Sequence, residues 1–527
     1  MKNLFKKIAA ITLLIVFPAL MLLGCTAKTN NTPAPDTTTA PADDNASGKP
    51  AASELAPVTL TFWSCGDKYS AQDEVLAAFC EKYKSQLNIE KIQYNFVSFG
   101  DYEDKMTALV AGGDSFDGFF VADWMLYAKM ANKGALLPLN DLMEQYAPTL
   151  FKTYEDNGST IACSINGQLV ALPWTTNKSS KAVLLYRKDL AQKYGVDTSR
   201  LETIEDLDRM FTDAKAKVPD ITIFESGFPR GNTYSDVLAV LHSKYELDAM
   251  NYHMLTTDLN SASVTIQPIE QTDMFKEAVT WMQKWYSEGI VSKNELSETD
   301  TQLFENGKTF AKVGLMGTAL QGIAFNIGGA EYGYAELYPD GKFRYDSPLN
   351  NAFAINKNAA NAERVLMLLE LLNTNEEAYD MFLYGIEGST YVINEGGAID
   401  YPEGQDSSNS TYLDWFRWPF IRSQFNKPSG SITAEALEAE NNWLQKNSLV
   451  VSPLIGFNPD TSSIKTELAQ RDQLYDEQGK LLLAGIIEGN DVSMAVDKYI
   501  QAQKNAGLDA IVSYMQAEAN QFIAGTK

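Results

Sequence analysis

GQLVALPWTTNKSSKAVLLYRKDLAQKYG, residues 167–195, consists of two short apolar segments separated by a polar run. The first apolar segment, residues 168–172, ends at Pro173, which cannot donate to the hydrogen-bond ladder of a central strand. The second, residues 182–186, continues into a helical pattern that closes at Gly195, the residue type preferred at a left-handed helix C-cap. We interpret the polar run between them, residues 175–181, as a solvated hinge that joins strands of two lobes, with a substrate site beside the crossing.

Strand and helix patterns alternate in the sequence before this hinge. Residues 58–63, 89–97 and 116–121 have strand-like patterns, and each is followed by a segment of helical periodicity. This alternation predicts an α/β fold with a parallel, doubly wound sheet, in which ligands bind outside the carboxyl ends of the strands. After the hinge, Thr203 and Asp206 have the spacing of a capping box, which predicts a helix at the start of the second lobe.

Length and charge limit the classes of function. A chain of 527 residues exceeds what one hydrophobic core usually supports, so at least two domains are expected. The formal charge is −25, and loss of the three lysines in the first 24 residues would take it to −28. Such a charge argues against nucleic acid or an anionic membrane surface as partner, because both bind basic patches. It suits an extracytoplasmic protein whose ligand is not strongly anionic.

The N-terminus has the pattern of a secretory signal. Residues 1–24 combine a basic start with an apolar run, and residues 22–25, LLGC, resemble a bacterial lipobox in which Cys25 accepts the lipid. The alternative is a plain signal peptide with an incidental cysteine. Residues 25–57 are poor in large apolar side chains and predict a flexible tether, on the order of 30 Å in reach, between the lipid and the folded part.

Motifs of common enzyme classes are missing from the sequence. The two histidines, His242 and His253, belong to no zinc-protease motif, and the chain has no complete phosphate-binding loop. Cys65, Cys80 and Cys163 form no zinc or disulfide pattern and are interpreted as small buried residues. We therefore expect no metal, no cofactor and no catalysis. A glycoside hydrolase stays open at this point, since 68 acidic residues make nearby carboxylate pairs inevitable.

The hinge, with its Leu-Pro-Trp and Leu-Leu-Tyr-Arg-Lys-Asp-Leu segments, resembles the lobe-crossing segment of carbohydrate-type (family 1) extracellular solute-binding proteins of ABC importers. Residues 384–388, YGIEG, and 456–459, GFNP, resemble the LipO-type lipoproteins with an uncharacterised C-terminal domain. The resemblance implies a two-lobe, type II periplasmic-binding-protein-like fold. It implies that lobe one comprises residues 58–176 and 343–387, lobe two residues 177–342 and 388–448, and a helical C-terminal region residues 449–527.

Candidate ligand-binding residues follow from the chemistry of a neutral sugar, which offers apolar C–H faces and a ring of hydroxyl groups. Aromatic platforms and polar side chains at strand ends meet that need. The aromatic candidates are Trp63, Trp124, Trp174, Tyr391, Trp415 and Trp418, and the polar candidates are Asp67, Asp123, Asn177 and Gln321. The alternative for each tryptophan is core packing, and for each polar residue a solvated surface position.

The resemblance implies a lipid-anchored, monomeric receptor on the extracytoplasmic face of the bacterial cell membrane. It would close two lobes around a carbohydrate, most readily an oligosaccharide, and pass it to the permease subunits of an ABC transporter, whose separate ATPase supplies the energy. Two other functions stay open from the residues alone: a peptide-binding receptor of an ABC importer and a secreted glycoside hydrolase. The sequence assigns no role to the C-terminal region.

Overall fold

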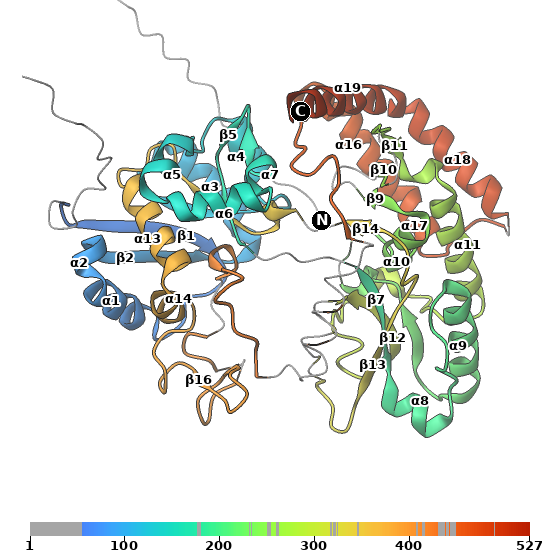
Figure 1. Ribbon diagram of the computed structural model, residues 1–527. Helices are drawn as coiled ribbons and strands as arrows, with labels where there is room; N and C mark the ends of the chain where they lie inside the picture. Colours follow the sequence, from blue (N-terminus) through green and yellow to red (C-terminus); the bar gives the residue numbers. More distant parts are fainter. Residues whose placement is uncertain are drawn as a thin grey trace, which may run out of the picture. The chain divides into compact units, whose positions relative to one another are not determined.

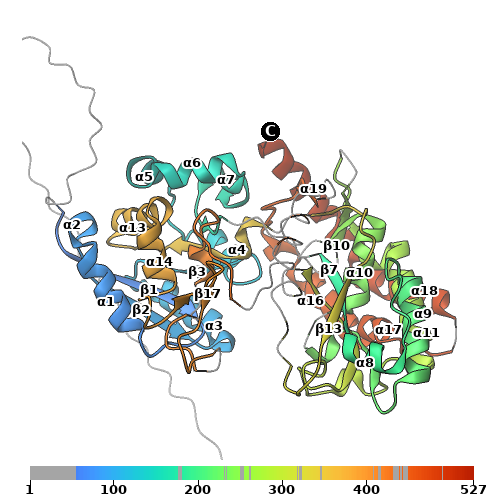
Figure 2. The ribbon, with the colours of Figure 1, turned by 60° about the horizontal axis from the view of Figure 1, so that its bottom comes forward.

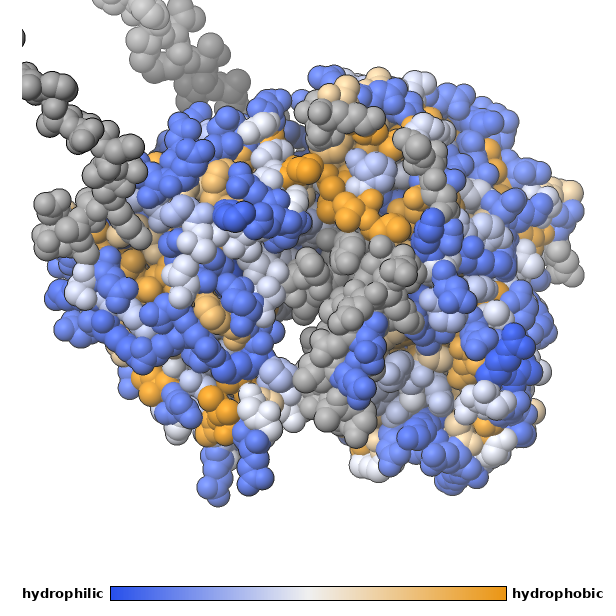
Figure 3. All heavy atoms as spheres, viewed as in Figure 1, coloured by the Kyte–Doolittle hydropathy of each residue, from blue (hydrophilic) through white to orange (hydrophobic). Residues whose placement is uncertain are grey.

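A computed structural model of the chain describes residues 55–175, 181–230, 232, 234–249, 255–259, 263–316, 319, 323, 325–344, 347–406, 409–413, 417–430, 438, 442, 449–489 and 491–526. The expected signal peptide, Cys25 and most of the expected tether lie outside these residues. In the described part, no helix combines the length and the apolar character that crossing a membrane requires. Hydrophilic side chains cover much of the face drawn in Figure 3, with smaller hydrophobic groups between them.

The first lobe is built on a five-stranded sheet, in the order β2 (Ile89–Val97), β1 (Val58–Cys65), β3 (Gly118–Val121), β15 (Ala352–Ile355) and β6 (Leu172–Pro173). Strand β1 is parallel to β2 and to β3, as the alternation of strands and helices predicts. The two remaining strands differ from a purely parallel sheet, because β15 is antiparallel to both β3 and β6.

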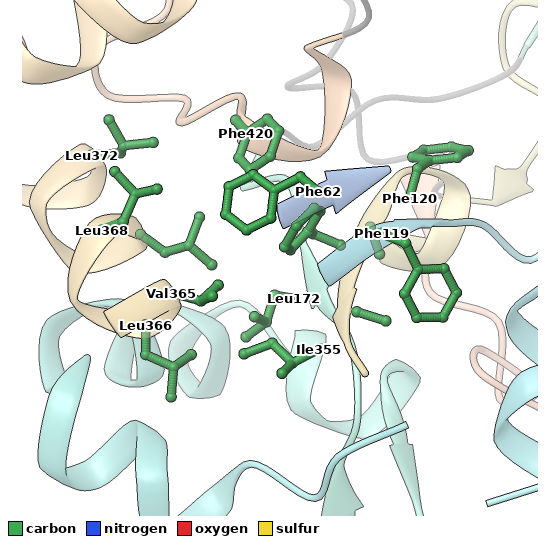
Figure 4. Packing of buried hydrophobic residues seen from close by; sticks show 14 of the residues in the cluster. Phe62, Phe119, Phe120, Leu172, Ile355, Val365, Leu366, Leu368, Leu372 and Phe420 are labelled. Atoms are coloured by element: carbon green, nitrogen blue, oxygen red, sulfur yellow. The ribbon is translucent and has the colours of Figure 1, made fainter. Parts of the chain in front are cut away.

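Helices cover the two faces of this sheet. Helices α3 (Phe99–Gly112) and α13 (Ala362–Thr374), both labelled in Figure 1, lie on opposite sides of β1 and β2 in the view of Figure 2. Every described side chain of α13 except Glu363 and Thr374 is buried, which fits a helix that packs on several sides. In Figure 4 the apolar residues of α13 face Phe62 of β1, and Phe420 lies over the same ring. The rings of Phe62 and Phe353 meet edge to face with centroids 5.0 Å apart.

One expected domain boundary is wrong, as the residues in the core of the first lobe show. We expected residues 388–448 to belong to lobe two, but Tyr391, Tyr412 and Phe420 are all at most 5% exposed in the core of the first lobe. Their rings fill space between α14 (Glu376–Leu383) and the sheet; Phe420, for example, lies 5.3 Å from Phe382. Periodicity identifies buried residues but not the sheet against which they pack, so the sequence could not give this assignment.

The second lobe has a four-stranded sheet in the order β13 (Tyr332–Glu336), β7 (Ala182–Arg187), β12 (Thr309–Leu315) and β8 (Thr222–Glu225). Strand β12 is parallel to β8 and antiparallel to β7, which in turn is antiparallel to β13. Helices α9 (Ile204–Lys217), α10 (Asp236–Tyr245) and α11 (Asp273–Ser287) pack on this sheet, with Trp285 fully buried. The predicted capping box of α9 is present, formed by Thr203 and Asp206.

Phe343 marks a second corrected boundary. The resemblance placed residues from 343 onward in lobe one, but β14 (Phe343–Arg344) pairs with β18 (Leu449–Val450). The ring of Phe343 packs in a cluster with Val183 and Leu185 of β7, in the second lobe. Because the chain returns to the first lobe by Leu349, the crossing falls between residues 344 and 349.

The C-terminal region shares the core of the second lobe. It contains α16 (Lys465–Leu474), α17 (Lys480–Leu483), α18 (Val492–Asn505) and α19 (Leu508–Thr526). Tyr475, Leu483 and Tyr499 are buried in the same apolar cluster as Trp285. The last helix packs on the second lobe through an apolar face, since Ile511 and Met515 cluster with Leu255 and Ile266.

A buried ion pair joins the C-terminal region to the second lobe. The guanidinium of Arg471 donates to both carboxylate oxygens of Glu270, at 2.6 and 2.9 Å. The two side chains are 3% and 0% exposed. Burial by itself lowers the pKa of Arg471, but the hydrogen bonds and charge of Glu270 outweigh it and raise the pKa. A buried bidentate pair fixes orientation as well as position.

A second group of buried charges fixes the loop that follows β8. Arg230 pairs with Glu225, with Nη1 and Oε1 2.6 Å apart, and with Asp236 at the start of α10. Gly227 has φ +100, and a Cβ there would lie 2.6 Å from the Asp236 carboxylate, so the turn requires glycine. Glu295 accepts a hydrogen bond from the backbone N–H of Ser226 at 2.5 Å, while its Oε2 is buried without a partner among the described residues.

Burial raises the pKa of two carboxyl groups in this cluster. The pKa of Glu295 rises to about 7 and that of Asp236 to about 6, in both cases chiefly because burial disfavours the charged form. A carboxyl group with a raised folded-state pKa stabilises the fold at low pH. That contribution is lost as the pH rises through the folded-state pKa.

Arg471→Ala is expected to lower the free energy of unfolding by about 3 to 5 kcal/mol, because it leaves the Glu270 carboxylate buried without its partner. Urea denaturation measures the change. Arg471→Met combined with Glu270→Leu should recover much of the loss, since no buried charge remains. Lys480→Ala is the control: its pair with Asp476 is 33% and 67% exposed, so the loss should stay below about 1 kcal/mol. Equal denaturation midpoints for Arg471→Ala and Lys480→Ala would refute the role of the buried pair.

Glu295→Gln is expected to flatten the pH dependence of stability between about pH 5 and pH 8. The wild-type protein loses the contribution of protonated Glu295 over this range, on the order of 3 kcal/mol at about 1.4 kcal/mol per pKa unit, and the variant has no group to titrate. Thermal unfolding of both proteins across this range gives the difference. Glu298→Gln is the control. Hydrogen bonds from the backbone N–H groups of Asp300 and Thr299 lower the pKa of Glu298, so its effect should appear only in acid. Parallel curves for wild type and Glu295→Gln would contradict the prediction.

Candidate functional site

The carboxyl edge of the first sheet gathers segments from distant parts of the chain. Strands β1 and β3 end there, β6 ends there, and β15 begins there because it runs in the opposite direction. The backbone N–H of Asp123 donates to the carbonyl of Leu349 at 2.9 Å, and that of Trp174 donates to the carbonyl of Asn351 at 3.1 Å. Three sequence-predicted candidates, Asp123, Trp124 and Trp174, are therefore brought to one edge.

Trp124 is the aromatic residue most open to a ligand at this edge. Its side chain is 45% exposed, and its indole N–H donates to the carbonyl oxygen of Asn350 at 2.8 Å. The ring of Phe120 supports it from behind, with the centroids 5.7 Å apart. A hydrogen bond at one end and a packed ring beside it limit the rotation of the indole, so an oriented aromatic surface faces solvent.

Trp63 and Asp67 line a neighbouring cavity of about 500 Å³, at the ends of β1 and β2. Asp67 is exposed, and the ammonium of Lys105 lies 5.5 Å from the centroid of the Trp63 ring. Carboxylate, amide and aromatic groups thus surround this space, as the sequence analysis expects for these two residues. Lysines also line it, which the sequence analysis did not anticipate.

Other candidates occupy different environments. Trp174 and Tyr391 are 7% and 5% exposed, so neither ring presents a free face to solvent, and burial raises the pKa of Tyr391 to about 12. Trp418 is 42% exposed at the first position of a short 3-10 helix (Trp418–Phe420). The predicted candidates Asn177, Gln321 and Trp415 lie outside the described residues.

The second sheet presents a comparable edge. Parallel strands β8 and β12 point toward it, with β8 ending opposite Lys312 and β12 continuing to Leu315, and β7 begins beside the end of β12 because Ala182 pairs with Leu315. The hinge that precedes β7 and the loop that follows β12 both start at this edge. The loop after β8, residues 226–235, joins them and was missed by the sequence analysis. The sequence feature that could have predicted this loop is Gly-Phe-Pro-Arg-Gly at 227–231, because glycine and proline so close together are typical of an ordered turn.

Chemical reactivity is limited among the described residues. Cys65, Cys80 and Cys163 are buried and form no disulfide, as predicted. Burial raises the pKa of the Cys65 thiol to about 12 and that of the Cys163 thiol well above its usual value, which disfavours a nucleophilic thiolate. Within the described ranges, no group of three or more His, Cys, Asp and Glu side chains could hold a metal ion.

Known proteins with similar sequences and folds share this architecture. The family model described as bacterial extracellular solute-binding protein matches residues 67–379, and a domain of unknown function, DUF3502, matches residues 453–524. A carbohydrate ABC transporter substrate-binding protein of Streptococcus pneumoniae is 23% identical over 475 residues, which cover 89% of this chain and 91% of the relative.

Two solved structures show how far the fold agrees. The N-glycan transport solute binding protein (NgtS) of Streptococcus pneumoniae is 21% identical, with a TM-score of 0.74, over 90% of this chain and 100% of that chain. A human-milk-oligosaccharide (HMO) binding solute-binding protein of Bifidobacterium longum infantis is 15% identical, with a TM-score of 0.63, over 90% of this chain and 100% of the other. The fold is the two-lobe α/β fold that the resemblance implied. Since the family model covers more than half of the chain, this protein belongs to the bacterial extracellular solute-binding proteins.

Proposed function

We propose that this protein captures a neutral carbohydrate, an oligosaccharide, outside the cell and delivers it to the permease of an ABC importer. The observation that carries the proposal is Trp124, an indole held by Asn350 and Phe120 with 45% of its surface open at the carboxyl edge of the first sheet. An oriented aromatic face in that position binds the C–H face of a sugar ring. Carboxylates such as Asp123 and Asp67 accept hydrogen bonds from its hydroxyl groups.

Similar proteins support the ligand class. NgtS is described in complex with Man1GlcNAc and with Man5GlcNAc, and FusA of Streptococcus pneumoniae in complex with kestose. These ligands belong to those proteins, and all three are saccharides, which supports a carbohydrate ligand. The charge of −25 on this chain agrees with a neutral ligand, because it disfavours the approach of an anion.

Closure of the two lobes is the mechanism we infer. The described residues of 55–175 and 347–430 build the first lobe, and those of 181–344 and 449–526 build the second lobe with its C-terminal region, so each lobe is discontinuous in sequence. A ligand that contacts both sheet edges only in the closed form binds that form more tightly and shifts the population toward it. The permease then binds the closed form, and a separate ATPase supplies the energy for transport.

The N-terminal residues complete the proposal. Lipidation of Cys25 would anchor the receptor as a monomer at the extracytoplasmic face of the cell membrane, and residues 25–57 would let it move above the permease. The receptor role assigns no catalytic step to this chain. A hydrolase would release reducing ends from the bound sugar, whereas a receptor returns it intact.

A panel of oligosaccharides, monosaccharides and peptides tests the ligand class by thermal shift, using protein that begins at Val58. Ligand at about 100 times its dissociation constant should add about 2.7 kcal/mol, seen as a rise of a few degrees in the unfolding temperature. We expect a rise with one class of oligosaccharide and no new reducing ends in the sample afterwards. A rise with peptides alone would refute the carbohydrate assignment, and hydrolysis of the sugar would refute the receptor.

Trp124→Ala is expected to weaken binding of that oligosaccharide roughly tenfold. Loss of the stacking surface should cost up to about 1.4 kcal/mol of binding free energy, which corresponds to a tenfold change in the dissociation constant. Its unfolding temperature should change little, since the side chain is half exposed. Isothermal titration calorimetry measures the affinity. The control is Trp281→Ala on α11, whose indole N–H donates to Glu277 of the same helix at 3.2 Å, away from both sheet edges. Unchanged affinity in Trp124→Ala would remove this residue from the site.

A further inference from the structure

A second cavity, of about 590 Å³, lies between the first lobe and the C-terminal region. Its first-lobe wall comes from helices α4 to α7 and the β4–β5 hairpin, residues 132–169, and its other wall from residues 456–459 and α19. None of the sequence-predicted binding residues lines it. Nothing in the receptor mechanism proposed above uses it.

The lining has the chemistry of a saccharide site. Carboxylate and amide groups face the space from both walls, including Glu155 and Asn166 on one side and Asn458 and Gln521 on the other. Phe151 and Phe522 supply aromatic surface. No lysine, arginine or histidine is among the described lining residues, so the cavity offers no counter-charge to an anion. Hydrogen-bond donors and acceptors beside aromatic rings suit a neutral ligand that carries many hydroxyl groups.

Close packing shapes one border of the cavity. Gly456, with φ +80, lies so near α7 that a Cβ at this position would be 2.5 Å from the Cα of Ala162 and 2.8 Å from its carbonyl oxygen. Only glycine permits both this backbone conformation and this approach. On the first-lobe wall, Asn140 accepts from the backbone N–H of Leu169 at 2.7 Å and donates to the carbonyl of Gly167 at 3.3 Å, which fixes the hairpin.

The cavity adjoins the carboxyl edge that carries Trp124. Helix α7 (Ser159–Ala162) contributes Thr160 to the cavity and packs beside the 3-10 helix η5 (Pro348–Asn350). The last residue of η5, Asn350, is the one whose carbonyl oxygen holds the indole of Trp124. One short helix therefore separates the aromatic platform from the second cavity.

We propose that this cavity is an extension subsite for the far end of a long oligosaccharide whose near end stacks on Trp124. The inference rests on the proposed carbohydrate-binding function and gives the C-terminal region a part in it. The subsite selects for chain length: a sugar of one or two rings occupies the Trp124 edge alone, whereas a longer chain continues into the cavity and gains contacts there.

Gln521→Trp tests this by filling the cavity from α19, where Gln521 is exposed at the rim. Ala517→Trp is the matched control, because Ala517 is exposed on the same helix and does not line the cavity. Calorimetry of both variants, of wild type and of Trp124→Ala against an oligosaccharide series of increasing length gives affinities, and thermal unfolding confirms that each variant is folded. We expect Gln521→Trp to lose tenfold or more in affinity for the longest sugars and nothing for the shortest. Ala517→Trp should match wild type, and Trp124→Ala should lose affinity at every length.

The outcomes separate this inference from the proposed function. Wild-type affinity of Gln521→Trp at every length would overturn the subsite and leave carbohydrate binding intact. Equal losses at every length would also overturn it, because the cavity would then act on lobe closure rather than on the far end of the sugar. A wild-type protein that binds no saccharide of any length would overturn both.

Discussion

The insertion of β15 between β3 and β6 is the constraint on which the first lobe depends. This strand arrives about 230 residues after β3, yet it supplies the central antiparallel pairing of the sheet and buries all four of its residues. Its entry segment delivers the carbonyl groups of Asn350 and Asn351, which accept hydrogen bonds from Trp124 and Trp174. Without β15 the sheet would lose a strand and the aromatic platform its support. Because the strands of the second sheet lie between β3 and β15 in the sequence, this pairing requires the chain to leave the first sheet and return to it.

The position of the C-terminal region on the second lobe depends on apolar contacts and one buried ion pair. Its apolar contacts with the second lobe supply the stabilising area, and the buried pair of Arg471 and Glu270 determines orientation. Two buried charges cost desolvation energy that their attraction barely offsets, so such a pair favours one arrangement more than it adds stability. The C-terminal region thus contacts both lobes, because the buried pair holds it on the second while Gly456 lies against α7 of the first.

Much of the fold could be predicted because it depends on local patterns. The capping box of Thr203 and Asp206 and the β–α alternation of the first lobe are both present in the structure. The sequence could not predict in which lobe residues 388–448 lie. Tyr412 and Phe420 are apolar enough for either core, and their sequence pattern does not say which sheet they pack against. The strand-end pattern predicted that Asp123 and Trp124 lie at the carboxyl edge of the first sheet, where the structure has them; their contact with a ligand stays a prediction. The burial of Trp174 depends on Asn351, nearly 180 residues away, and the anchored loop after β8 depends on ion pairs that sequence spacing does not show.

Preorganisation explains why buried charges and backbone contacts surround the two sheet edges. A flexible loop or a freely rotating indole loses conformational entropy when it binds, and that loss weakens affinity. The carbonyl of Asn350 orients Trp124 before any ligand arrives, and Arg230 does the same for the loop after β8 by bonding Glu225 and Asp236. Burial raises the pKa of Asp236 and of Glu295 in that cluster, so the order of this loop comes at a cost to stability near neutral pH. Under the proposed closure, groups that are already ordered at the sheet edges lose less entropy on binding, which leaves more of the binding free energy to favour the closed form.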